Sequence, residues 1–170
     1  MKKTLLAVAA LMAINAGTGF AAPINDLSKG QTAVGVVFHN NSPDSDTFYL
    51  EHKLSDNFTL GLQNVDWKYG GSMDDIYGQV NLSNNLRAIV GNRDFDSGSK
   101  LYLGAAVNGS LSPDWDGYAS LISGSQFNEV QVGANYKIAR NVDFNLNYRS
   151  YMPDEGDNIN GLGFGASLKF

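Results

Sequence analysis

The feature that most constrains this chain is a short turn motif that recurs four times at nearly constant spacing. Each copy has an apolar residue, three turn-forming residues and a second apolar residue, which ends one strand and begins the next. The copies begin 28, 29 and 27 residues apart, at Leu54, Leu82, Leu111 and Ile138. Because this period accommodates one β-hairpin and a loop, it predicts an up-and-down antiparallel β-barrel.

Between the turns, apolar and polar residues alternate with period two, which is typical of strands with one apolar face. The clearest alternation places Val130, Val132 and Ala134 between polar or small residues. The segment 115–123 alternates least, and without it the prediction would be eight strands with a long excursion. Alternation also fails near Asn64, which predicts a bulge or an early exit from the membrane. Ten strands are expected, at 31–39, 47–54, 58–67, 74–82, 86–95, 100–111, 115–123, 127–138, 142–152 and 159–170.

The other connections between these strands are longer on average than the four turns, and most are rich in Gly, Asp or Ser. Short turns at one end and longer loops at the other are typical of outer-membrane barrels, whose short turns are periplasmic. The longer connections are expected at 40–46, 68–73, 94–99, 124–126 and 153–158.

The first 21 residues have the features of a secretory signal peptide. Two lysines follow the initiating methionine, an apolar run covers 5–14, and small residues precede a cleavage site after Ala21. The apolar run is too short to be a comfortable membrane anchor. The expected organisation is a signal peptide at 1–21, a short periplasmic N-terminal segment at 22–30 and a transmembrane barrel at 31–170.

Charge and composition exclude several classes of protein. Without Lys2 and Lys3, 10 basic residues remain against 17 acidic ones, a net charge of −7 that argues against nucleic acid as a partner. The chain has no cysteine, so disulfides and thiolate metal sites are excluded. No apolar stretch beyond the signal reaches helical spanning length, so any membrane crossing must be made by strands.

Two features favour a membrane barrel over a soluble barrel with an apolar interior. The polar face carries Gln, Asn, Lys, Glu and many Gly, which suits a crowded polar lumen. Aromatic residues on the apolar face lie near both ends of the strands, as in the aromatic girdles that meet membrane interfaces. The expected girdle residues are Phe38, Phe48, Phe58, Trp115 and Tyr136.

The last strand carries a family resemblance. It ends in Phe170 and has apolar residues, among them Leu168 and Phe164, at every second position before that. This resembles the C-terminal signal of bacterial outer-membrane barrels, which the barrel-assembly machinery recognises. The whole chain resembles the small OmpA/OmpX-type and OmpW-like barrels of Gram-negative bacteria. The resemblance implies a monomer in the outer membrane whose partners are lipids, lipopolysaccharide and the secretion and assembly machinery. It carries over no functional residue.

Nine charged residues are expected to face the lumen. Six of them form a ring near the turns, with four cations and two anions, which predicts a surplus of about two positive charges at the periplasmic mouth. The outer rim is acidic, so the two mouths should differ in electrostatic sign. Higher in the lumen, glycines are expected to face tyrosines and arginines. The expected lumen charges are Glu51, Lys53, Arg87, Arg93, Asp116, Lys137, Asp143, Arg149 and Lys169.

The sequence offers little for catalysis or metal binding. Hydrolysis by a nucleophile needs a serine beside a histidine base. The two histidines, His39 and His52, have no serine two residues away, and His52 falls on the lipid-facing parity. Acidic loop residues could bind Ca²⁺, but 154–158 lacks the EF-hand spacing. Neither a cofactor nor a metal site is predicted.

A ten-stranded barrel leaves only modest room for a passage. The sequence therefore predicts a non-enzymatic envelope or surface protein whose narrow lumen is mostly filled by polar side chains and paired charges. The alternative is a narrow porin-like channel for small polar solutes. In such a channel, water would pass the small inward-facing residues halfway along the lumen. An outer-membrane lipid-modifying enzyme is a more distant alternative.

Overall fold

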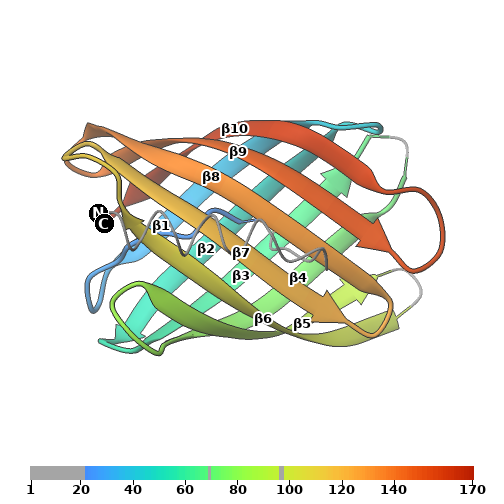
Figure 1. Cartoon of the computed structure of the whole chain (residues 1–170), viewed down its shortest axis with the longest axis horizontal. Helices are drawn as coiled ribbons and strands as arrows, with labels where there is room; N and C mark the ends of the chain where they lie inside the picture. Colours follow the sequence, from blue (N-terminus) through green and yellow to red (C-terminus); the bar gives the residue numbers. More distant parts are fainter. Residues whose placement is uncertain (1–21, 69, 96–97) are drawn as a thin grey trace.

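The structure is a computed structural model and describes residues 22–68, 70–95 and 98–170, so the expected signal peptide lies outside the described residues. Ten antiparallel strands close into a single barrel in which each strand pairs with its neighbours in sequence and β1 pairs with β10 (Figure 1). The predicted ten-stranded barrel is confirmed, and its weakest predicted strand forms β7. The strands are β1 (Thr32–Asn40), β2 (Ser45–Ser55), β3 (Phe58–Trp67), β4 (Ser72–Asn81), β5 (Leu86–Phe95), β6 (Gly98–Ser110), β7 (Trp115–Gly124), β8 (Phe127–Ala139), β9 (Val142–Pro153) and β10 (Ile159–Lys169). No helix in the described ranges is long and apolar enough to span a membrane.

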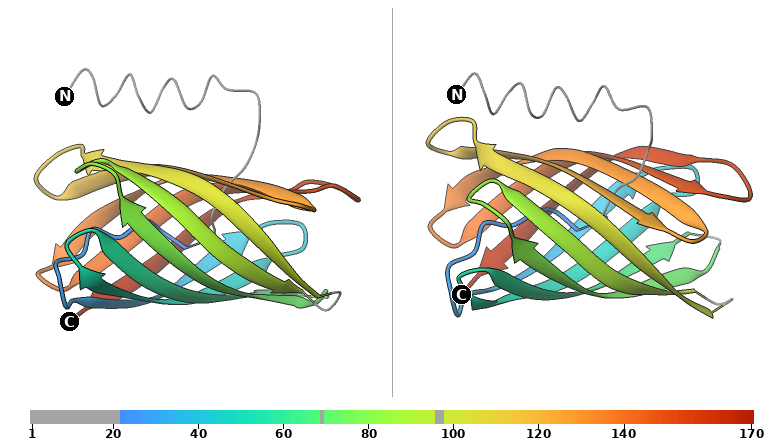
Figure 2. Two further views of the ribbon diagram at one scale, coloured as in Figure 1. Left: turned by 90° about the horizontal axis from the view of Figure 1, so that it is seen from below. Right: turned by 60° about the horizontal axis from the view of Figure 1, so that its bottom comes forward.

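Because the number of strands is even, β1 begins and β10 ends at the same end of the barrel (Figures 1 and 2). We call this the turn end, since the turns at 56–57, 82–85, 111–114 and 140–141 lie there, and we call the opposite end the loop end. Thr32 and Phe170 exchange two backbone hydrogen bonds of 2.7 and 2.9 Å. These bonds join the C-terminal residue to the first strand and help to close the barrel.

Two expectations about the loop end are corrected. The loops are shorter than expected, because strand pairing continues further: β2 already begins at Ser45 and β4 at Ser72. The bulge expected near Asn64 is wrong, since β3 pairs in continuous register with both neighbours through this residue. The register shifts lie at the turn end instead, between Lys53 and Ser55 and between Lys137 and Ala139.

What changes near Asn64 is the polarity of the two faces of the wall. Along most of the barrel the outward side chains are apolar and exposed. Toward the loop end, Asn64 and Asp74 lie on the outer face and share a 2.9 Å hydrogen bond, whereas Val65 and Met73 are buried inside. A wall that is polar outside and apolar inside suits water rather than lipid. The strands therefore extend beyond the apolar belt at this end.

Four buried tyrosines fill the middle of the barrel, and each lies directly opposite a glycine of the neighbouring strand. A Cβ atom on Gly61 would overlap the Tyr77 ring, so the ring can lie flat along the wall only because the side chain opposite is missing. The expectation that glycines face tyrosines is confirmed. The pairs are Gly35–Tyr49, Gly61–Tyr77, Gly91–Tyr102 and Gly133–Tyr118.

Candidate functional site

The turn half of the lumen is occupied by residues 22–28, which we call the N-terminal plug (Figure 2). Ile24 and Asn25 are 2% and 1% exposed. The Asn135 side chain donates a 3.0 Å hydrogen bond to the Ile24 carbonyl, and Arg87 donates one of 2.8 Å to the Asn25 carbonyl. The start of the segment that the sequence assigns to the periplasm thus lies inside the barrel.

Glu51, which is fully buried, anchors the plug to the wall. Its carboxylate accepts hydrogen bonds from Asn25 of the plug (2.8 Å), from the Tyr77 hydroxyl (3.0 Å) and from Gln79 (2.6 Å). A buried charge is costly unless it is well hydrogen-bonded. Since the plug supplies one of the three donors, the plug and the buried carboxylate stabilise one another.

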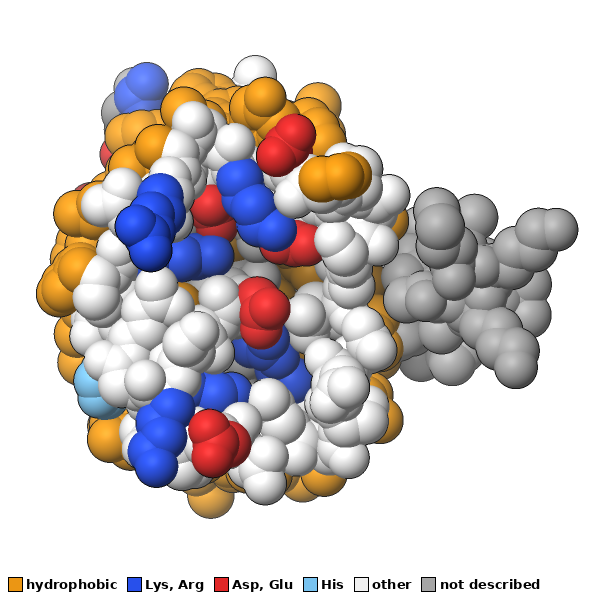
Figure 3. Space-filling model, turned by 90° about the vertical axis from the view of Figure 1, so that its left-hand side faces the viewer, with side chains coloured by type: hydrophobic (Ala, Val, Ile, Leu, Met, Phe, Trp, Pro, Cys, Tyr) orange, Lys and Arg blue, Asp and Glu red, His pale blue; other side chains and the backbone are white. Residues whose placement is uncertain are grey.

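Charged side chains surround the mouth at the turn end (Figure 3). The ion pairs there are Lys137–Asp116 (2.9 Å), Lys169–Asp143 (2.6 Å) and Arg87–Asp26 (3.7 Å). Asp26 belongs to the plug and was not included in the ring expected from the sequence. It reduces the positive surplus expected at this mouth, so the contrast in charge between the two ends is smaller than predicted.

Above the tyrosines, a buried ionic cluster crosses the lumen. Arg93 donates two hydrogen bonds to Asp75 (2.7 and 2.8 Å) and one to Glu129 (2.8 Å). Arg149 donates one of 3.0 Å to the same Glu129 oxygen. The cluster holds two positive and two negative side chains, all of them almost fully buried. It is therefore electrically balanced within the barrel.

An aromatic cap closes the lumen beyond the ionic cluster. The Arg93 guanidinium lies 4.5 Å from the centre of the Phe127 ring. Phe127 in turn packs against Phe95 and Tyr151, at 5.7 and 5.9 Å between ring centres. Trp67 packs against Tyr151 at 5.6 Å. These four rings come from β3, β5, β8 and β9, so the cap joins strands from opposite sides of the barrel.

Sequence reasoning missed the plug, the cap and the role of Glu129. Glu129 has the lumen-facing parity of β8, but only the register of β8 and β9 shows that it meets an arginine. The sequence did contain a signal for the cap. Trp67, Phe95 and Phe127 lie at strand ends next to loops, at positions that alternation assigns to the inner face, which is polar along most of the barrel.

The remaining predicted residues take the following places. Glu51, Lys53, Arg87 and Asp143 are buried in the turn half of the barrel, whereas Lys137 is exposed at the mouth. The expected girdle residues and the residues of the expected assembly signal are on the outer face: Phe38, Phe48, Phe58, Trp115, Tyr136, Phe164, Leu168 and Phe170.

The histidines lie in settings that do not resemble a hydrolase site. His39 is buried inside the barrel, with Nε2 3.0 Å from the side-chain oxygen of Asn147. His52 is on the outer face, with Nδ1 2.9 Å from the hydroxyl of Thr32. Across the residues that the structure describes, no group of three His, Asp or Glu side chains is placed to hold a metal ion.

No model of a known protein family matches the sequence, and no curated protein is significantly similar to it. Solved structures do match the fold. The KdgM porin superposes with a TM-score of 0.53 and 11% identity over 81% of this chain and 99% of that one. The NanC porin gives 0.52 and 8% identity over 81% and 100%. The N-terminal barrel of Pseudomonas aeruginosa OprF gives 0.48 and 12% identity over 85% and 100%. The closed ten-stranded barrel and its superposition on the two porins show that the chain has an outer-membrane β-barrel fold.

Proposed function

We propose that this protein is a closed, non-conducting barrel of the bacterial outer membrane that serves as an envelope or surface protein without catalysis. The turn end would face the periplasm and the loop end the cell exterior, as in other outer-membrane barrels. Outer-membrane lipids, lipopolysaccharide and the assembly machinery would be its partners, and the protein would act as a monomer. Its apolar outer face and the shared fold support this location.

The observation that carries the proposal is the filling of the lumen along its length. The N-terminal plug occupies the turn half, the tyrosine rings the middle, and the ionic cluster with the aromatic cap the loop half. Two independent closures in series would each have to open before a solute could pass. Small barrels are commonly filled by their own side chains, and here a terminal segment completes the filling.

The second candidate is a narrow passive channel for small polar solutes. KdgM and NanC are porins, and their fold is shared. Once the expected signal peptide is removed, residues 29–31 are the covalent attachment of the plug to the wall, and its contacts with Glu51, Asn135 and Arg87 are non-covalent. Release of the plug would require only non-covalent contacts to break. A shared fold does not by itself imply a shared function. The ionic cluster and the aromatic cap, which close the loop half of the lumen, argue against a permanently open path.

Single-channel conductance of the refolded protein in planar bilayers tests the proposal. We expect no conductance steps from the wild type, and none from a variant that lacks residues 22–28, because the loop-half closure remains. Altered migration on unheated gels would verify that the variant is folded. Steps from the wild type would establish the channel alternative. Steps from the shortened variant alone would show that the plug is the sole closure of a channel.

A further inference from the structure

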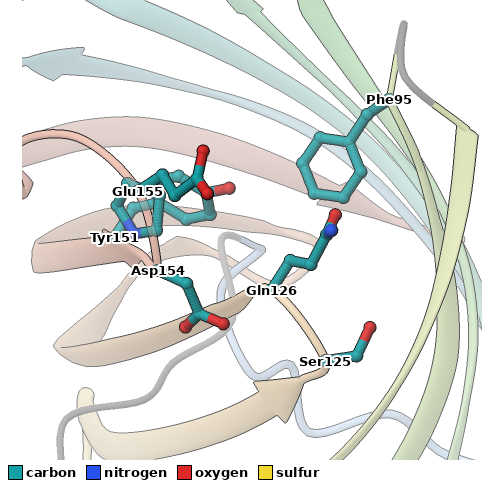
Figure 4. Close-up of a pocket in the computed structure, with 7 residues that line it drawn as sticks. Phe95, Ser125, Gln126, Tyr151, Asp154 and Glu155 are labelled. Carbon is teal, nitrogen blue, oxygen red and sulfur yellow. The ribbon is translucent and has the colours of Figure 1, made fainter.

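A cleft opens at the loop end, on the outer side of the aromatic cap, and shares Phe95 and Tyr151 with it. It has a volume of about 520 Å³, which is within the range of roughly 300–1,000 Å³ that is usual for small-molecule sites. Its lining comes from the end of β5, the β7–β8 loop and the end of β9 with the loop that follows. The lining residues are Phe95, Ser125, Gln126, Tyr151, Pro153, Asp154 and Glu155 (Figure 4).

Aromatic side chains give the cleft fixed apolar walls. Phe95 and Gln126 lie across from Tyr151 (Figure 4). Phe127 is fully buried and contacts both the Phe95 and Tyr151 rings. The Arg93 guanidinium, which is held by Asp75, lies against the inner side of Phe127, so the walls are backed by the buried ionic cluster. The cleft is therefore preformed rather than dependent on a ligand.

Two carboxylates complete the cleft. Asp154 and Glu155 are exposed, and neither takes part in an ion pair with another described residue. The Asp154 backbone N–H donates a 3.0 Å hydrogen bond to the Gln126 carbonyl. This bond joins the two loops and keeps the carboxylates beside the aromatic walls. None of the described residues that line the cleft is a lysine or an arginine.

The surroundings strengthen the negative potential of the cleft. Among the described residues, Lys68 and Lys100 are the only cations at the loop end that are not buried. The buried Arg93 and Arg149 below the cleft are balanced by Asp75 and Glu129. Clustered charges of one sign raise the local concentration of oppositely charged ligands. The exposed carboxylates on the same end are Asp44, Asp46, Asp66, Asp74, Asp94, Asp154, Glu155 and Asp157.

We propose that this cleft binds a small organic cation, an amine or guanidinium carried on an apolar body. The apolar body would lie between Phe95 and Tyr151 and contact their rings. The Tyr151 ring already lies 5.9 Å from both Arg93 and Arg149, so the carboxylates rather than this ring would hold the charged group. The charged group would pair with Asp154 and Glu155. A carboxylate or phosphate ligand would meet uncompensated like charge, and a neutral ligand could form a hydrogen bond but no ion pair with the two acids.

The chain contains a reporter for the test. It has two tryptophans, and Trp67 packs directly on Tyr151, whereas Trp115 is on the outer face at the turn end. In refolded Trp115→Phe protein, Trp67 would be the only tryptophan. We would titrate this protein with phenethylamine as the probe, and with phenylethanol and phenylpropionate as the neutral and anionic analogues. We expect a saturable fluorescence change for the amine alone.

Asp154→Asn with Glu155→Gln should weaken phenethylamine binding about tenfold, equivalent to roughly 1.4 kcal/mol. The matched control is Asp44→Asn with Asp46→Asn, which removes the same charge from the same end outside the cleft and should change affinity less than twofold. Higher salt should also weaken binding, because the carboxylates are exposed. Equal losses from both double variants, equal binding of the three probes, or no saturable change would each overturn the proposal.

Discussion

Replacing Arg93 with methionine tests whether the buried ionic cluster holds the loop half of the barrel together. Methionine is a flexible, unbranched side chain that can pack on the Phe127 ring, but it removes the charge and with it the contact of the guanidinium with this ring. Asp75 would lose both hydrogen bonds from the guanidinium and keep only Gln63 (2.6 Å) and a long contact with Tyr102 (3.4 Å). The cluster would then carry one uncompensated negative charge.

Breaking a buried ion pair by removing one partner typically costs about 3–5 kcal/mol, because the other charge stays buried. We expect Arg93→Met to lower the free energy of unfolding by about that amount, and Asp75→Asn to have a comparable effect. In the Arg93→Met, Asp75→Asn double variant, Arg149 and Glu129 remain as a balanced pair. The double variant should therefore lose much less free energy of unfolding than the two single variants lose together. The predicted coupling energy is about 2–3 kcal/mol.

Reversible denaturant unfolding of the refolded protein in lipid vesicles, followed by tryptophan fluorescence, would measure these values. The matched control is Lys68 with Asp44, a 3.8 Å pair whose side chains are 60% and 51% exposed. Removing such an exposed pair should show a coupling of about 0–1 kcal/mol. A loss below about 1 kcal/mol for Arg93→Met, with additive effects in the double variant, would refute the reasoning.

Three further predictions concern the barrel as a whole. Because a closed barrel has no unpaired edge, the unheated protein should resist unfolding in SDS and migrate differently after boiling, whereas a single mobility would contradict a closed barrel. Phe170→Ser should reduce outer-membrane levels while leaving export intact, because it alters the last strand where this resembles an assembly signal and leaves the expected signal peptide unchanged. The backbone bonds to Thr32 remain and only an outward side chain is lost, so the barrel itself should still close; unchanged levels in fractionated cells would show that the C-terminal resemblance is misleading. Gly61→Ala should destabilise the barrel by about 1–3 kcal/mol by overlap with Tyr77, whereas Gly70→Ala, which meets open space, should have little effect in the same unfolding assay.

The strands could be predicted from the sequence because period two and turn residues are local signals. The strand between 115 and 123 had weak alternation, yet hydrogen bonding on both sides makes it β7. Its small residues give little contrast in polarity, but they do not prevent backbone pairing. The tyrosine–glycine contacts were also predictable, since parity places both residue types on the inner face.

The loop half was less predictable, because the environment of the outer face changes along a strand. Alternation continues through Asn64 and Val65, but the polar side chain now faces outward and the apolar one inward. The sequence pattern left a bulge and an early exit from the membrane open here, and only the continuous register excludes the bulge. The ionic cluster depends on the register between strands. Alternation along one strand shows which side chains face the lumen, but not that Glu129 of β8 lies beside Arg149 of β9. No periodicity marks the plug, since its contacts with Glu51 and Asn135 join distant parts of the chain.

The most direct test of the central claim is the accessibility of the plug to a thiol reagent. The chain has no cysteine, so a single engineered one is the only thiol. In the refolded protein, Ile24→Cys should resist a bulky maleimide and react only after boiling in SDS, because Ile24 is 2% exposed. Ser28→Cys, at the exposed end of the plug, should react in both states. Equally fast labelling of the two cysteines in the folded protein would contradict a lumen filled by residues 22–28.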